Sequence, residues 1–62
     1  MSVYLQERTK DLSLYRRGNL AIVEMAEGEN AETEVFMRLS AYELRVLAAG
    51  ALGLADELEK NK

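Results

Sequence analysis

The segment SAYE, which begins at Ser40, constrains the fold of this chain most, because the hydrophobic pattern changes its period there. SAYE has the form of a capping box. The Ser40 hydroxyl accepts a hydrogen bond from the amide of Glu43, and the Glu43 carboxylate accepts one from the amide of Ser40. Leu39 and Leu44 are placed to form the hydrophobic staple that accompanies such a box. We therefore predict a helix over about 41–59.

The predicted helix carries two apolar stripes on opposite sides. We expect the first to cover a sheet, because its residues recur every three or four positions and gather within about a third of the circumference. This leucine stripe consists of Leu44, Leu47, Ala48, Ala51, Leu54, Ala55 and Leu58. The second, the small-residue stripe, consists of Tyr42, Val46, Ala49, Gly50 and Gly53.

The small-residue stripe is interpreted as a contact with another molecule. A glycine inside a helix costs about 1 kcal/mol relative to alanine, and small side chains leave a shallow groove for a second element. Two alternatives stay open: the glycines admit the protein's own sheet or loop, or the stripe is ordinary exposed helix. The uncharged run from Val46 to Ala55 is about half the length that a bilayer requires. The acidic residues that follow it argue against a helix lying on a membrane surface.

The first part of the chain, residues 3–39, has the alternation of strands. Gly18-Asn19 is a hairpin signal between two apolar runs. A two-residue loop there places Leu14 opposite Val23, and the run TEVFMRLS predicts a further strand. The run VYLQER either continues the first strand or forms a separate edge strand. We predict a single α+β domain over 1–62: a three- or four-stranded antiparallel meander followed by one C-terminal helix packed on one sheet face.

Both faces of the predicted sheet carry apolar residues. Tyr15, Ile22 and Phe36 fall on the face that one helix leaves open, so they join the small-residue stripe as candidate partner or dimer interface residues. A domain of about 60 residues has a marginal core, and this chain has no cysteine for disulfides and no histidine or cysteine for zinc. We therefore expect a homodimer.

The residue inventory disfavours several classes of function. Histidine, cysteine and a glycine-rich phosphate loop are all absent, so we expect neither an enzyme nor a cofactor or metal site. A net charge of -3 with scattered basic residues argues against direct nucleic-acid binding. A secretory signal needs an apolar run near the start of the chain, where this sequence has charged residues such as Glu7 and Arg8. We therefore expect a cytoplasmic protein without membrane contact.

Five carboxylates crowd the predicted loop between the second and third strands. This acidic patch consists of Glu24, Glu27, Glu29, Glu32 and Glu34. It is either a solvated hairpin tip or a surface that meets a basic protein, such as one that ordinarily binds nucleic acid.

The order of a short β-meander followed by RLSAYELRVLAAGALGLADELE resembles small proteins encoded by bacteriophages. The layout is also similar to that of the dimeric uracil-DNA glycosylase inhibitors of Bacillus phages, acidic proteins with a three-stranded sheet and one helix that occupy the host enzyme's DNA-binding groove. The resemblance implies a protein encoded by a phage or mobile element that acts by binding a host factor. Because apolar residues lie on both layers and catalytic residues are missing, we predict a non-enzymatic, homodimeric modulator or inhibitor of a host protein, with a nucleic-acid-processing enzyme as one candidate target. The alternative is a structural or assembly component of a larger particle.

Overall fold

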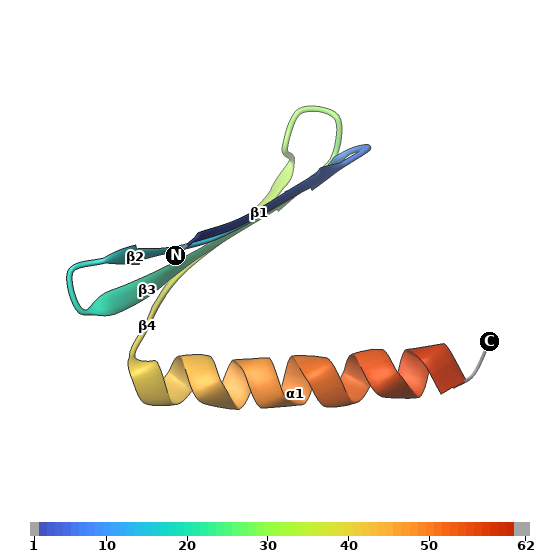
Figure 1. Ribbon diagram of the computed structural model, residues 1–62. Helices are drawn as coiled ribbons and strands as arrows, with labels where there is room; N and C mark the ends of the chain where they lie inside the picture. Colours follow the sequence, from blue (N-terminus) through green and yellow to red (C-terminus); the bar gives the residue numbers. More distant parts are fainter. Residues whose placement is uncertain (1, 61–62) are drawn as a thin grey trace.

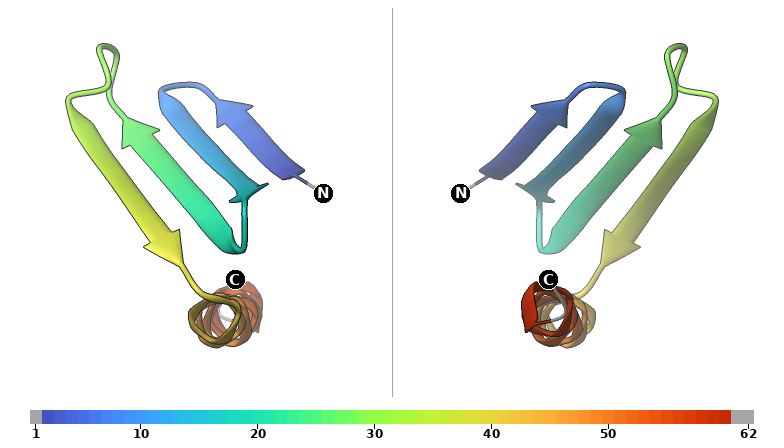
Figure 2. Two further views of the ribbon diagram at one scale, coloured as in Figure 1. Left: turned by 90° about the vertical axis from the view of Figure 1, so that its left-hand side faces the viewer. Right: turned by 90° about the vertical axis from the view of Figure 1, so that its right-hand side faces the viewer.

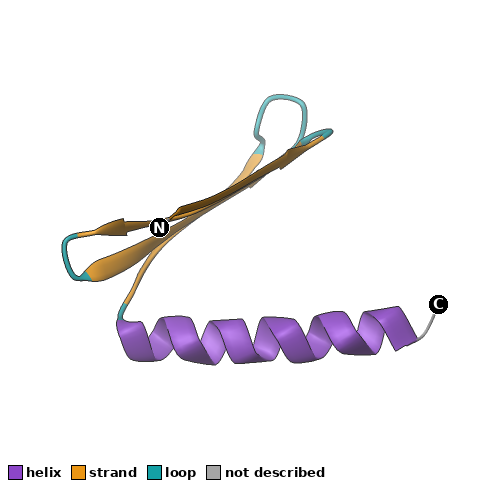
Figure 3. Cartoon of the chain, viewed as in Figure 1, coloured by secondary structure: helices purple, strands orange, loops and turns teal. Residues whose placement is uncertain are grey.

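The computed structural model describes residues 2–60, which form one antiparallel sheet and one helix (Figure 1). The strands lie side by side in sequence order, as a meander. They are β1 (Ser2–Glu7), β2 (Lys10–Arg17), β3 (Leu20–Glu27) and β4 (Thr33–Leu39), and the helix α1 spans Ala41–Lys60. Figure 3 shows this division into a strand half and a helix half. The predicted α+β fold is confirmed, and the run VYLQER belongs to a separate edge strand.

The β2–β3 hairpin has the predicted register. Leu14 pairs with Val23 across a two-residue loop. Gly18 takes a φ of +65° at the first loop position, where a hairpin of this length favours glycine. The guanidinium Nε of Arg16 donates a hydrogen bond to the carbonyl of Gly18 at 2.6 Å, which ties the end of β2 to the turn.

The strand register sorts the side chains into two unlike faces, because successive residues of a strand point to opposite sides. We call the first the apolar face; it carries Val3, Leu5, Leu12, Leu14, Ala21, Val23, Met25, Val35, Met37 and Leu39. The second, the aromatic face, carries Tyr4, Tyr15, Ile22 and Phe36 among polar residues that include Asp11, Ser13, Glu24, Glu34 and Arg38.

The helix begins where the capping box predicts. The amide of Ser40 donates to Glu43 Oε1 at 2.8 Å, and the amide of Glu43 donates to Ser40 Oγ at 3.2 Å. Leu39, on the strand side of the cap, is 8% exposed, and Leu44, on the helix side, is half-buried. The junction between β4 and α1 is therefore held by polar and apolar contacts together.

Beyond this junction the helix leaves the sheet. Figures 1 and 2 show α1 starting beneath the β2–β3 turn. Figure 1 shows it diverging from the strands as it runs toward its C-terminal end. Its contacts are with β3 and β4, so it packs on one sheet face as predicted. The extent of the packing differs from the expectation that the leucine stripe covers the sheet. No residue of Ala41–Lys60 is buried, and Leu58 is 64% exposed.

The buried core is correspondingly small. Among residues 2–60, the buried hydrophobic side chains are Ile22, Val23 and Leu39, at 1%, 5% and 8% exposure. All three lie in the strands β3 and β4. The core thus lies where β3 and β4 pair next to the start of the helix, and no helix residue is buried in it.

The capping box makes helix stability depend on pH. Hydrogen bonds from the backbone and then the side chain of Ser40 lower the pKa of Glu43 below its ordinary value of 4.5. A lowered folded-state pKa gives stability that is present above the unfolded value and lost as pH falls through the folded one. We expect Glu43→Gln to be less stable than the native chain at neutral pH, with the difference shrinking in acid.

Urea unfolding followed by circular dichroism, at neutral pH and below pH 4.5, measures this difference. Glu57→Gln is the control, because it removes a carboxylate from the same helix without touching the cap. A deficit for Glu43→Gln that is equally large at both pH values would contradict the role given to the carboxylate.

Candidate interaction surfaces

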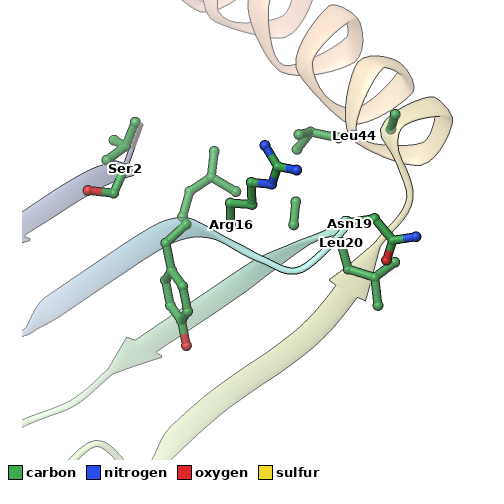
Figure 4. Close-up of a pocket in the computed structure, with 10 residues that line it drawn as sticks. Ser2, Arg16, Asn19, Leu20 and Leu44 are labelled. Carbon is green, nitrogen blue, oxygen red and sulfur yellow. The ribbon is translucent and has the colours of Figure 1, made fainter.

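A groove of about 380 Å³ lies where the start of the helix meets the sheet (Figure 4). In this view Arg16 points toward the helix and Leu44, whereas Leu20 points to the other side of the sheet. The groove therefore joins the apolar face to the leucine stripe. It is lined by Ser2, Val3, Leu14, Tyr15, Arg16, Asn19, Leu20, Ala21, Ala41 and Leu44.

Outside this groove the apolar face is open. Met37 is 53% exposed, and Leu5, Met25 and Val35 are exposed to a similar degree. The charged residues on this face lie at its ends. Near the loops, the Nζ of Lys10 lies 3.8 Å from Glu27 Oε2, while Arg16 is at the β2–β3 turn. The face thus has an apolar centre and a charged rim.

The leucine stripe faces the apolar face across the opening between helix and sheet. Leu44 lines the groove, and residues three and four positions further along a helix share its side. Leu47 and Leu58 follow at such spacings, and both are exposed. Two apolar surfaces of one chain thus face each other. Within residues 2–60 the helix contacts β3 and β4, and Figure 1 shows that it lies nearest to the sheet at its N-terminal end.

The small-residue stripe lies on the opposite side of the helix and is exposed throughout. Tyr42 is 75% exposed, and Val46 is exposed beside it along the helix. A Cβ added at Gly50 or Gly53 would meet no atom within 4 Å. The sequence left open that these glycines admit the protein's own sheet, and the structure removes that alternative.

The aromatic face combines rings with carboxylates. Tyr15 donates a hydrogen bond to Glu24 at 3.3 Å, and the guanidinium of Arg38 lies 5.4 Å from the centre of the Phe36 ring. A shallow hollow of about 380 Å³ lies on this face and is lined by Tyr4, Asp11, Ser13, Glu24, Met25, Ala26, Glu34, Val35 and Phe36. The face offers negative charge and ring surface, which together suit a lysine or arginine side chain.

One candidate interface residue is corrected by the structure. Ile22 was expected on an open sheet face, but it is 1% exposed and belongs to the core. Its register neighbours are Tyr15 and Arg38, whose long side chains flank it on both adjacent strands. Tyr15 and Phe36 remain accessible on the aromatic face.

The structure does not gather the acidic patch into one cluster. Glu24 and Glu34 lie on the aromatic face, whereas Glu27 pairs with a lysine at the edge of the apolar face. Glu29 lies in the exposed β3–β4 loop, and Glu32 there accepts a hydrogen bond from the amide of Asn30 at 3.3 Å. The patch is spread around one end of the sheet.

Sequence reasoning missed the contribution of β1 to both faces. Tyr4 donates a hydrogen bond to Asp11 at 3.2 Å on the aromatic face, and Val3 and Leu5 extend the apolar face. The alternation of Val3, Tyr4 and Leu5 is the signal that identifies these residues. It assigns them to a face only once β1 is known to be a separate strand.

The part of the chain described by the structure, residues 2–60, contains no group of three potential metal ligands placed to share an ion. Within the same residues, no helix combines the length and the apolar character needed to span a bilayer. The chain has no significant match among protein-family models, curated proteins or solved structures.

The Tyr4–Asp11 contact predicts a measurable titration. Desolvation, the hydrogen bond to Asp11 and the negative charge of that carboxylate together raise the pKa of Tyr4 above its ordinary value of 10.0. Asp11→Asn removes the charge, so we expect it to lower the pKa of Tyr4. Ultraviolet absorbance titration measures this pKa in a Tyr15→Phe, Tyr42→Phe background, where Tyr4 is the remaining tyrosine. An unchanged pKa after Asp11→Asn would contradict the contact.

The open space at Gly53 predicts the effect of adding a methyl group there. We expect Gly53→Ala to raise the free energy of unfolding by about 0.5–1 kcal/mol, because alanine favours the helix and meets no neighbour. Gly18→Ala, the matched control, should instead destabilise the chain, because Gly18 has a φ of +65°. Urea unfolding measures both. Destabilisation by Gly53→Ala would indicate that another molecule packs closely on the small-residue stripe.

Proposed function

We propose that this chain is a non-enzymatic protein-binding module, a small homodimer that modulates or inhibits a host protein in the cytoplasm. One observation carries the proposal: large apolar side chains are exposed on both the sheet and the helix, while the described residues bury a core of three hydrophobic side chains. Contiguous exposed apolar surface in a folded protein marks a site of interaction.

The two sheet faces support two kinds of contact. The apolar face has no charge in its centre, as expected of a surface that is covered permanently. The aromatic face keeps carboxylates beside Tyr15 and Phe36, as expected of a surface that binds a partner reversibly through charge and rings. We assign self-association to the first face and the host protein to the second.

The resemblance to phage inhibitors extends the proposal to the class of partner. Glu24 and Glu34 on the aromatic face, with Glu29 and Glu32 in the adjoining loop, present negative charge at one end of the sheet. A nucleic-acid-processing enzyme offers a basic surface of matching charge. Occupation of that surface by this chain would exclude the nucleic acid.

A second candidate is a structural or assembly component of a larger particle. It is favoured by the two outer strands, β1 and β4, whose outer edges pair with no other strand in the sheet. Open edges allow the sheets of two molecules to pair edge to edge. Growth of the assembly beyond a closed dimer with rising concentration would favour this candidate over an inhibitor.

The proposed role of the carboxylates predicts salt-dependent association with the partner. The partner is first isolated from lysate of the source organism by affinity capture, and its association rate is then followed by surface plasmon resonance. Replacing Glu24, Glu29, Glu32 and Glu34 by glutamine should slow association about tenfold or more at low salt and flatten its salt dependence.

The matched control replaces the same four glutamates by aspartate, which keeps the charge and should keep the rate within a few-fold. An association rate that is equal in the glutamine and native chains at every salt concentration would remove the carboxylates from recognition. Failure to capture any specific partner would count against the function itself.

A further inference from the structure

We propose that a second copy of this chain covers the apolar face and the leucine stripe, with the helix of each copy lying on the apolar face of the other. The inference rests on the proposed function and specifies the surfaces through which its homodimer forms. It assigns no role in self-association to the small-residue stripe or to the aromatic face.

The surface area of the chain favours such a partner. A compact monomeric protein of 7.0 kDa exposes about 4,000 Å². This chain exposes 5614 Å², an excess of about 1,600 Å² by the same relation. Two copies that hide their excess bury about 3,200 Å², which lies in the range of about 2,000–5,000 Å² found for obligate homodimers.

The shape of the chain locates the excess. Its radius of gyration is 13.1 Å, the value expected for a compact domain of about 100 residues. The cause is visible in Figure 1: the helix meets the sheet at one end and stands away from it at the other. The uncovered area is therefore the apolar face together with the leucine stripe.

The width of the sheet makes a second helix necessary. Four strands span about 14 Å between the outer strand axes, whereas a helix with its side chains is about 10 Å across. One helix, even fully seated, leaves part of the apolar face open. Because packed helices lie 8–10 Å apart, the face accepts two helices side by side, one from each copy.

Charge favours an antiparallel arrangement of these helices. Helix α1 starts beneath the β2–β3 turn, the end at which Arg16 points toward the helix, and runs toward the end that holds the acidic β3–β4 loop (Figures 1 and 4). A two-fold axis perpendicular to the helices reverses the partner's helix. Its acidic end, with Glu57 and Glu59, then lies near Arg16 and away from the glutamates of the loop.

The experiment measures molar mass by light scattering across about a hundredfold range of concentration, with two matched pairs of variants. We expect a native mass near twice 7.0 kDa. Met37→Glu and Leu47→Glu should each raise the dimer dissociation constant about a hundredfold or more, because they bury an unpaired charge. Phe36→Glu is the control for Met37→Glu and Val46→Glu for Leu47→Glu, because each lies one residue away on the opposite side of its strand or helix. Both controls should leave the dimer dissociation constant within a few-fold of the native value.

A second measurement keeps the test decisive if Met37→Glu or Leu47→Glu does not fold. Arg16→Cys and Glu59→Cys chains are mixed and treated with a short bis-maleimide linker, which is possible because the native chain has no cysteine. We expect cross-linked dimers in the mixture and far fewer in either preparation alone. Equal cross-linking in all three samples, or none, would overturn the antiparallel arrangement.

Failure of this inference is distinguishable from failure of the proposed function. A native dimer that survives Met37→Glu and Leu47→Glu but dissociates on Phe36→Glu or Val46→Glu overturns the inference, while capture of a host partner still supports the function. A native monomer at every concentration also overturns it, and leaves the apolar face to be tested against the host partner.

Discussion

The attachment of the helix to the sheet at one end governs the rest of this structure. Leu39 is buried at the end of β4, and the capping box at Ser40 starts the helix immediately afterwards, so the direction of α1 is set within two residues. The remaining turns then extend away from the strands. The apolar face and the leucine stripe, each patterned for burial, consequently meet over a short distance.

This geometry explains how a chain with 48% hydrophobic residues buries few of them. In a compact domain, a helix and a sheet cover each other and leave polar outer surfaces. Here the apolar face and the leucine stripe both have the hydrophobic pattern of buried surfaces, but they diverge and so do not cover each other. A partner chain that fills the opening would complete two incomplete cores at once, which is how an obligate homodimer gains its stability.

Much of the fold could be predicted from the sequence because its signals are local. Gly18 at a positive φ fixes the β2–β3 register, and Ser40 with Glu43 fixes the start of the helix. The β1–β2 turn was not predictable in this way. Arg8 takes a φ of 55° without being glycine, so the local sequence carries no turn signal there, and the register of β1 depends on pairing with β2 instead.

The candidate surfaces were predicted less completely, because exposure depends on packing that is not local. Ile22 lies on the sheet face that the helix leaves open, so it was expected to be exposed. Long side chains on both neighbouring strands bury it instead. The angle between helix and sheet is set at the junction of Leu39 and Ser40, and no hydrophobic pattern in the sequence specifies it. The periodicity of the leucine stripe shows which side of the helix is apolar, and it does not show what covers that side.

The proposed dimer implies that the stability of the chain comes in large part from association with a second copy. The most direct test is the thermal unfolding midpoint of the native chain, measured by circular dichroism across about a hundredfold range of protein concentration. A dimer that unfolds to separate chains must show a midpoint that rises with concentration, and we expect this rise. A midpoint that is the same at every concentration would contradict it, because the folded state would then be complete within one chain.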